Sequence, residues 1–279
     1  MRVGVVGCGL MGAGIAEVCA RAGQDVIVVE STQERVDAGR DRIVSSLQRA
    51  QSKGKIEAAQ PAIDRIRLTD DLNQLEDREL VIEAVVEHEP TKLDLFTRLD
   101  QVVKASDAIL ATNTSSIPVM KLATATQRPA NVVGIHFFNP VPVLSLVEIV
   151  PSLLTSPETT RRAQDFAEQS LGKHAIRSPD RAGFIVNALL VPFILSAVRM
   201  VESGFATAED VDEGLVRGAA HPQGPLRLAD LIGLDTTAAI AQSLYAEFKE
   251  PLFAPPPLLN RMVEAGLLGR KSGRGFYEY

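Results

Sequence analysis

The sequence contains no tryptophan, two cysteines and no excess of basic residues in 279 positions. Its net charge of −6 argues against nucleic-acid binding, because a nucleic-acid-binding surface needs clustered Lys and Arg. Cys8 and Cys19 have the spacing of neither a metal site nor a disulfide framework, which favours reduced thiols in a cytoplasmic protein. The longest apolar stretch, near 188–197, contains Pro192 and is too short to span a membrane. The chain starts directly with a strand pattern, so no signal peptide is expected.

What remains is a composition typical of a globular protein, with 46% hydrophobic and 23% charged residues, and a length that accommodates two domains. The first thirty residues hold the clearest pattern. A β-branched run at 2–6 predicts a buried parallel strand, and a helical stretch at 13–22 and a second strand pattern at 25–29 follow. Between the first strand and the helix lies G-x-G-x-x-G, made of Gly7, Cys8, Gly9, Leu10, Met11 and Gly12.

Each glycine of this motif has a physical role in binding a dinucleotide. Gly7 permits a tight turn, Gly9 lets a pyrophosphate approach the backbone, and Gly12 lets the helix pack closely on the strand. Glu30 ends the second strand, where a carboxylate can accept hydrogen bonds from an adenosine ribose. Its charge would repel a 2′-phosphate, which favours NAD over NADP, although nearby Arg35 could offset part of that repulsion. A glycine-rich surface turn is the alternative, and the surrounding strands, helix and acid disfavour it.

Further apolar runs at 80–86 and 108–111 predict two more buried strands. The first ends at Glu87, and the second runs into the polar stretch 112–116, Thr-Asn-Thr-Ser-Ser. Ligands of open α/β sheets bind outside the carboxyl ends of the strands, so this stretch is a candidate site. Such residues also cap helices, but five in a row exceed what one cap needs.

The run 132–135 predicts a strand that ends at His136, and a short apolar strand at 144–147 leads to Glu148. If 140–142, Pro-Val-Pro, forms a turn, Glu148 can lie beside His136. An imidazole next to a carboxylate is a general acid–base arrangement in which the acid fixes the tautomer. The alternative for a histidine in an apolar setting is a core residue with its hydrogen bonds satisfied.

The character of the chain changes near 178–183, a stretch with Pro and Gly, and only helices are expected beyond it. We therefore expect an α/β fold, with a Rossmann-type, doubly wound, mostly parallel sheet in residues 1–182 and an all-α domain in residues 183–279. The apolar helix faces of the second half exceed what one small bundle buries, which indicates a homodimer. One remaining feature, the basic turn with Lys53 and Lys55, is either a solvated loop or a contact for ligand phosphates.

Taken together, the motifs resemble those of the short-chain L-3-hydroxyacyl-CoA dehydrogenases, of the bacterial 3-hydroxybutyryl-CoA dehydrogenase type. The resemblance covers essentially the whole chain. It rests on GCGLMGAGIAEV at the start, NTSS from Asn113, HFFNPVPV from His136, GFIVN from Gly183, HPQGP from His221 and LGRKSGRGFYEY at the end. It implies oxidation of the 3-hydroxyl of an acyl-CoA to a ketone, with hydride transfer to NAD, and the reverse reaction.

The resemblance also implies roles for individual residues. His136 would be the general base, Glu148 its orienting partner, Ser115 a donor to the reacting oxygen, and Asn187 a contact from the helical domain. Lys53 and Lys55 would meet the nucleotide part of CoA, which makes Ser115, His136, Asn187, Lys53 and Lys55 the expected substrate-binding set. The expected cofactor-binding set is Gly7, Gly9, Leu10, Met11, Gly12, Glu30, Glu87, Lys92, Asn113, Ser115 and Asn139.

Two other functions stay open at this point. Some relatives act on hydroxyacyl groups held by a carrier protein, or on dicarboxylic groups, and the acyl chain length is not encoded in these motifs. A protein of a different class, a non-catalytic NAD-binding protein with the same fold, is disfavoured because Ser115, His136, Glu148 and Asn187 are all present.

Overall fold

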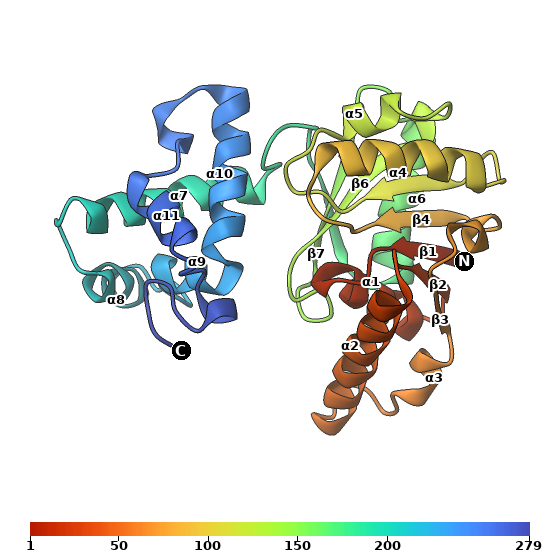
Figure 1. Ribbon diagram of the computed structural model, residues 1–279, viewed down its shortest axis with the longest axis horizontal. Helices are drawn as coiled ribbons and strands as arrows, with labels where there is room; N and C mark the ends of the chain where they lie inside the picture. The colour runs from red at the N-terminus through yellow and green to blue at the C-terminus, as the bar shows by residue number, and fades with distance from the viewer. The chain divides into compact units, whose positions relative to one another are not determined.

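The computed structural model describes residues 1–279 as two compact units, Met1–Asp180 and Arg181–Tyr279. The first unit is an eight-stranded sheet flanked by helices, and the second is helical (Figure 1). The predicted fold class, a mostly parallel doubly wound sheet followed by an all-α part, is confirmed. No helix is long and apolar enough to cross a lipid bilayer.

The sheet has the strand order β3-β2-β1-β4-β5-β6-β7-β8. Every neighbouring pair is parallel except β6 and β7, which are antiparallel. The strands are β1 (Arg2–Val6), β2 (Asp25–Val29), β3 (Ile66–Thr69), β4 (Leu80–Glu83), β5 (Ile109–Thr112), β6 (Val132–Phe137), β7 (Leu146–Pro151) and β8 (His174–Arg177). The carboxyl ends of the first six strands therefore share one edge of the sheet.

Four expected strands have different bounds in the structure. β5 spans Ile109–Thr112 and not 108–111, and β6 continues to Phe137, so that His136 lies within it. β4 stops at Glu83 and not at residue 86, because the Glu83 side chain accepts the N–H of Val85 at 2.7 Å and turns the backbone out of the sheet. β7 begins at Leu146 and not at residue 144, because the N–H groups of Val143 and Leu144 both donate to Pro140 O at 3.0 Å in a turn. Glu148 consequently lies inside a strand and not after one.

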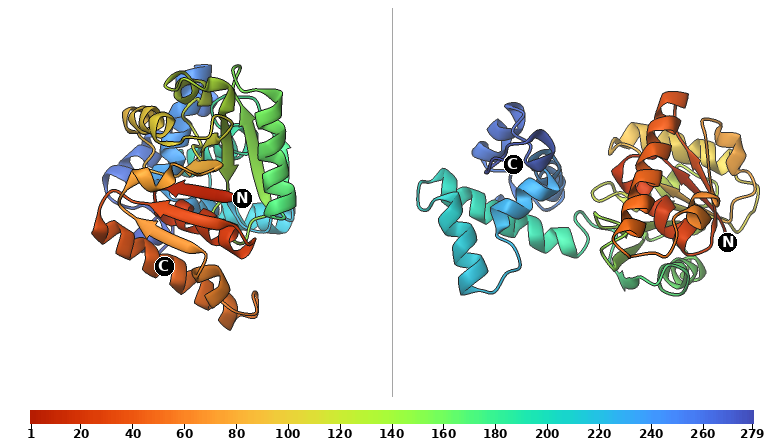
Figure 2. Two further views of the ribbon diagram at one scale, coloured as in Figure 1. Left: turned by 90° about the vertical axis from the view of Figure 1, so that its right-hand side faces the viewer. Right: turned by 90° about the horizontal axis from the view of Figure 1, so that it is seen from below.

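Helices cover both faces of the sheet (Figures 1 and 2). One buried core joins one face of the sheet to α1 (Leu10–Arg21), α2 (Gln33–Ser52), α3 (Gln60–Ile63) and α6 (Pro157–Asp165), with the π-helical turn Phe166–Ser170 that follows. α4 (Glu89–Val102) and α5 (Val119–Thr124) lie on the opposite face, and short 3₁₀ turns occupy Leu72–Leu75 and Pro129–Asn131.

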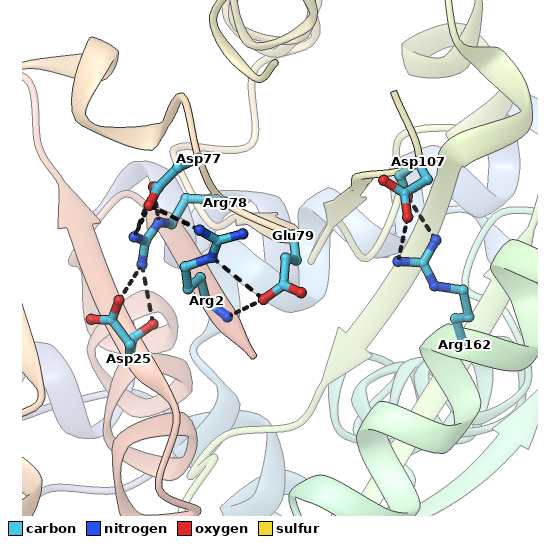
Figure 3. Close-up of polar contacts among 7 residues, drawn as sticks. All are labelled: Arg2, Asp25, Asp77, Arg78, Glu79, Asp107 and Arg162. Carbon is cyan, nitrogen blue, oxygen red and sulfur yellow. Dashed lines mark hydrogen bonds and ion pairs between the residues drawn. The ribbon is translucent and has the colours of Figure 1, made fainter. Parts of the chain in front are cut away.

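An ion-pair network joins the amino ends of the central strands (Figure 3). The Arg78 side chain is 4% exposed and contacts Asp25 at 2.9 Å and Asp77 at 2.7 Å. The backbone N–H of Arg2 donates to Glu79 at 2.7 Å. These contacts tie β1, β2 and the start of β4 together at the edge opposite the glycine-rich turn.

The second unit contains five helices, α7 (Val186–Glu202), α8 (Ala208–Gly218), α9 (Pro225–Ile232), α10 (Leu234–Phe248) and α11 (Pro257–Glu264), around one apolar core. Pro192 lies within α7, as expected from the sequence. α7 begins only at Val186, because Gly183 and Phe184 both have positive φ angles, of 74° and 48°. Thr207 caps α8 by accepting the N–H of Asp210 at 3.1 Å.

A buried acid holds the end of the chain in the helical unit. Asp230 is 1% exposed and accepts the N–H groups of Phe276 and Tyr277 at 2.9 and 3.0 Å. A Cβ atom on Gly275 would lie 2.0 Å from Asp230 Oδ1, so only glycine fits there. The glycine-rich turn near the end of the sequence is thus part of the core packing of this unit.

Candidate active site

The glycine-rich turn follows β1 directly and has the shape that the sequence predicts. Gly7 has a φ of 92°, and a Cβ atom there would lie 2.6 Å from Ala84 O. A Cβ atom on Gly12 would lie 1.9 Å from Gly7 O, whereas one on Gly9 would meet nothing within 4 Å. Gly7 and Gly12 are therefore required by close packing, and Gly9 leaves the backbone open on its outer side. Gly9 also begins α1 with no side-chain cap, so the first-turn N–H groups of α1 suit a phosphate.

A cavity of about 420 Å³ adjoins this turn. Gly7, Gly9 and Glu30 line it together with Leu72, Val86 and Leu95. Glu30 directly follows β2, and its Oε1 accepts the N–H of Cys8 at 2.6 Å. A carboxylate, apolar walls and open glycine backbone fit the ribose, adenine and pyrophosphate of a dinucleotide.

Sequence reasoning missed the walls of this cavity. Leu72 comes from a 3₁₀ turn after β3, and Leu95 from the second turn of α4. Arg98 and Asp94, one turn apart on α4, also line the cavity. No sequence motif identifies these residues. The sequence indicated only that a helix, now α4, begins shortly after a strand that ends at the ligand-binding edge of the sheet.

A buried ion cluster lies at the end of β4. Lys92 is 1% exposed, and its Nζ is 3.0 Å from Glu83 Oε1 and 2.7 Å from Glu87 Oε2. Burial raises the pKa of Glu83, and Lys92 opposes that shift. Burial also acts on Glu87, but Lys92 and the hydroxyls of Thr114 and Ser116 outweigh it and lower the pKa of Glu87. One ammonium thus holds two carboxylates at the ligand-binding edge of the sheet.

Glu87 anchors the polar turn that follows β5. Its Oε1 accepts the N–H groups of Ser115 and Ser116 at 3.2 Å each, and it also accepts the hydroxyls of Thr114 and Ser116. Asn113 is bound from the other side, because its Oδ1 accepts the N–H of Phe137 at 2.8 Å. The turn that carries Ser115 is therefore tied both to the ion cluster and to the end of β6.

His136 and Glu148 form a buried pair on β6 and β7. His136 is 5% exposed and Glu148 is fully buried, and they are direct partners in the antiparallel register. His136 Nδ1 lies 2.8 Å from Glu148 Oε2, and the ring of Phe138 packs at 4.6 Å between centroids. The carboxylate at Nδ1 fixes the orientation of the imidazole, which is the arrangement of a general acid–base pair.

The structure brings many of the predicted residues to one edge of the first unit. These are Gly7, Gly9, Gly12, Glu30, Glu87, Lys92, Asn113, Ser115, His136 and Glu148. Leu10 is 64% exposed at the start of α1, with Met11 beside it, and Asn139 is exposed just after β6. The catalytic and ligand-binding roles of these residues stay predictions.

Three other predicted residues lie elsewhere in the chain. Lys53 and Lys55 are exposed in the turn that follows α2. Asn187 lies in the first turn of α7, in the helical unit, and is 9% exposed. No group of three or more His, Cys, Asp or Glu side chains is placed to hold a metal ion.

A larger cavity of about 870 Å³ lies between α1, α3 and the turn before β8. Its three cations are engaged by the protein itself. Lys173 donates to Val141 O and Leu144 O at 2.6 Å each, Arg65 donates to Pro61 O at 2.6 Å, and Arg21 pairs with Glu17 at 3.3 Å. The smaller cavity beside the glycine-rich turn is therefore the better candidate for a cofactor.

Several known proteins are similar to this chain in sequence and fold along its whole length. The chain is 59% identical to a 3-hydroxybutyryl-CoA dehydrogenase of Mycobacterium tuberculosis, with 100% of this chain and 98% of the relative covered. The crystal structure of M. tuberculosis FadB2 matches with a TM-score of 0.98 at 59% identity, covering 100% of this chain and 98% of that one. That of (S)-3-hydroxybutyryl-CoA dehydrogenase from Ralstonia eutropha matches with a TM-score of 0.93 at 41% identity, with the same coverage.

Family models divide the chain in two. Residues 2–181 match the NAD-binding domain of 3-hydroxyacyl-CoA dehydrogenase, and residues 183–279 match its C-terminal domain. The two matches together span nearly every residue, and they meet where the structure separates the two units. The chain therefore belongs to the 3-hydroxyacyl-CoA dehydrogenase family.

Proposed function

We propose that the protein is an NAD-dependent 3-hydroxyacyl-CoA dehydrogenase that interconverts (3S)-3-hydroxyacyl-CoA and 3-ketoacyl-CoA. The expected substrate is short, 3-hydroxybutyryl-CoA, the substrate named for the relatives at 59% and 41% identity. The observation that carries the proposal is the buried contact of His136 Nδ1 with Glu148 Oε2 at the carboxyl end of β6, the strand edge at which α/β proteins bind their ligands.

The chemistry requires a base. Bound NAD supplies the hydride acceptor for C3, and the hydroxyl proton must leave C3 oxygen at the same time. Because Nδ1 of His136 is directed to Glu148, Nε2 is the atom that takes the proton in oxidation and returns it in reduction. The Glu148 carboxylate stabilises the imidazolium formed in that step.

Two further residues are proposed to act on the substrate. Ser115 lies in the turn anchored by Glu87, and its hydroxyl is proposed to donate to the reacting oxygen. Asn187, at the start of α7, is proposed to contact the substrate from the helical unit. In this arrangement Glu87 and Lys92 support the turn that carries Ser115 and contribute to the cofactor site.

The preferred cofactor is proposed to be NAD over NADP. Glu30 directly follows β2 and lines the cofactor cavity, so its carboxylate would meet a 2′-phosphate with like charge. Arg35 lines the same cavity, and its charge would offset part of this repulsion. The preference for NAD over NADP therefore depends on how far the repulsion of a 2′-phosphate by Glu30 exceeds its attraction to Arg35.

The CoA nucleotide is proposed to bind at the turn with Lys53 and Lys55. Both ammonium groups are exposed after the last turn of α2, and a polyanionic ligand needs local positive charge on a protein with net charge −6. Removing charge from this turn is therefore expected to weaken the binding of the whole thioester more than that of its acyl part.

The functional unit is proposed to be a homodimer, joined through the helical unit. Leu189 and Met200, three helical turns apart on α7, are 73% and 39% exposed, and Phe205 just after this helix is 78% exposed. Apolar side chains exposed on one side of a helix favour contact with a second protein surface. The proposed compartment is the cytoplasm, because Cys8 and Cys19 are both free thiols.

A substrate panel tests the proposed reaction. The purified protein is assayed with NADH and 3-ketoacyl thioesters of increasing chain length, carried on CoA, on pantetheine or on a carrier protein, and NADH absorbance is followed. We expect the highest kcat/KM for acetoacetyl-CoA. Turnover of carrier-bound or dicarboxylic groups with none of CoA thioesters would contradict the substrate assignment, and absence of all turnover with NADH bound would contradict the enzyme assignment.

A further inference from the structure

The peptide groups around Cys8, inside the glycine-rich turn, are held by two side chains of opposite charge. Glu30 Oε1 accepts the N–H of Cys8 at 2.6 Å, and Arg42 Nη1 donates to the carbonyl of Cys8 at 2.6 Å. Glu30 comes from the end of β2, and Arg42 from the middle of α2. The N–H and the carbonyl of Cys8 are thus both hydrogen-bonded to side chains from other elements.

The contact surface between α2 and this turn is closely fitted. Cys8 is 1% exposed, and a Cβ atom on Gly39 would lie 2.7 Å from its Sγ and 2.8 Å from its Cβ. Gly39 therefore leaves the space that Cys8 fills, and Arg42 reaches the Cys8 carbonyl from one turn further along the same helix. The sequence motif alone gave no reason to single out Gly39 or Arg42.

From these contacts we propose that Arg42 is a positioning residue for cofactor binding, acting through the backbone of the glycine-rich turn. The turn binds a pyrophosphate with N–H groups whose directions depend on the peptide planes before Gly9. Arg42 holds the plane that follows Cys8, the one that joins it to Gly9. Loss of Arg42 frees this plane to rotate, so ordering it on binding costs affinity.

This role rests on the proposed NAD binding, and it makes a prediction about which part of the cofactor is affected. A positioning effect through the turn weakens ligands that carry the pyrophosphate. It leaves adenosine, which binds between the cavity walls and Glu30, unchanged. A direct charge effect of Arg42 on the ribose would instead alter adenosine binding as well.

The test measures binding by calorimetry and by NADH fluorescence, with NADH, ADP and adenosine as probes of the full-length chain. Arg42→Met removes the donor, Arg42→Lys keeps a charged donor on the same helix, and Arg40→Met is the matched control, because Arg40 is exposed two residues away. Arg42 is itself an exposed side chain, so its replacement opens no core cavity. Thermal unfolding of each variant is measured alongside.

We expect Arg42→Met to raise the Kd for NADH and ADP by about tenfold, with adenosine binding and Tm unchanged, and Arg42→Lys to recover most of the loss. kcat at saturating NADH and the KM for the acyl thioester should stay at the unmodified values. Equal NADH affinity in Arg42→Met and Arg40→Met, or a matching loss for adenosine, would overturn the proposal. An unmodified protein that fails to bind NADH would overturn the proposed cofactor as well, so the two failures are distinguishable.

Discussion

Glu148 lies directly opposite His136 in the antiparallel pair of β6 and β7, and its Oε2 is 2.8 Å from His136 Nδ1. The contact does not depend on a flexible loop, because both residues belong to strands whose backbones are hydrogen-bonded to each other. The other three histidines are His88 and His174, which are exposed, and His221, which stacks near Phe193 in the helical unit. His136 is thus the histidine whose surroundings suit a base.

Replacing His136 with Ala should lower kcat by ~10² to 10⁴, about 2.7 to 5.5 kcal/mol of barrier, because no other group takes the hydroxyl proton. NADH binding should be nearly unchanged, since the imidazole is proposed to act on the substrate and not on the cofactor. Steady-state kinetics and NADH fluorescence measure the two quantities. His174→Ala, at an exposed position, is the control, and a folded, NADH-bound His136→Ala with near-normal kcat would show that the base is assigned wrongly.

Replacing Glu30 with Gln should shift the cofactor preference toward NADP(H). The amide oxygen can still accept the N–H of Cys8, so the turn is retained while the negative charge beside the ribose is lost. We expect the ratio of kcat/KM for NADPH to that for NADH to rise by about tenfold, or ~1.4 kcal/mol. Glu34→Gln, an exposed acid at the start of α2, should leave the ratio unchanged. An unmodified protein that prefers NADPH would contradict the assignment of Glu30.

Removing the charges of Lys53 and Lys55 together, by Lys→Gln, should raise the KM for acetoacetyl-CoA and leave the KM for NADH alone. The expected increase is about twofold to thirtyfold, because exposed ion pairs contribute about 0.2–1 kcal/mol each and two are removed. Lys104→Gln, another exposed lysine of the same unit, serves as the control. The same increase with a pantetheine thioester, which lacks the nucleotide, would show that these lysines do not contact it.

Replacing Lys92 with Met should destabilise the first unit by about 3–5 kcal/mol, because Glu83, which is fully buried, loses its counter-charge. Urea unfolding measures the free energy. Adding Glu83→Gln to the same chain should recover much of that loss, since the uncompensated charge is then gone. Lys121→Met breaks a pair with Glu89 that is about half exposed and should cost less than about 1 kcal/mol. Equal losses in both single variants would refute the buried cluster as a source of stability.

The two cysteines should resist alkylation in the folded protein. Burial, and for Cys8 also the charge of Glu30, raises the pKa of each thiol to about 12. At pH 8 only about one thiol in 10⁴ is then ionised, against roughly a quarter for an unperturbed cysteine with a pKa of about 8.5. Iodoacetamide followed by mass spectrometry should label both residues only after unfolding. The raised folded pKa also means that ionisation favours the unfolded chain above about pH 9, so stability should fall as the pH rises past that value.

Much of the sheet is readable from the sequence, because local patterns fix its central strands. The expected bounds of the first two strands, 2–6 and 25–29, match β1 and β2 residue for residue. The bounds of β4 and β7 were wrong, because both strand ends are set by bonds of a turn that the local pattern does not reveal, such as those of Val143 and Leu144 to Pro140 O.

The candidate site is less readable, because its contacts join distant segments. Glu83 lies in an apolar run and was expected to be an ordinary strand residue. It does end β4, but Lys92 and Thr112 also bind its carboxylate, which the local sequence does not indicate. Arg42 lies in a helix of ordinary polar composition, and its bond to Cys8 spans 34 residues. Sequence motifs identify residues whose chemistry is common to a fold. Residues such as Glu83 and Arg42, which hold other residues in place, are recognised only from tertiary contacts.

The antiparallel register of β6 and β7 also has a consequence for protein engineering. The distance between the imidazole and the carboxylate is set by strand pairing, and the eight residues from 138 to 145 help to set the register of that pairing. A slip of one residue in β7, which a connection of a different length could impose, would turn Glu148 to the opposite face of the sheet and away from His136. A foreign connection grafted between these strands is therefore expected to keep the contact of His136 with Glu148 only if it preserves the eight-residue length of the natural one.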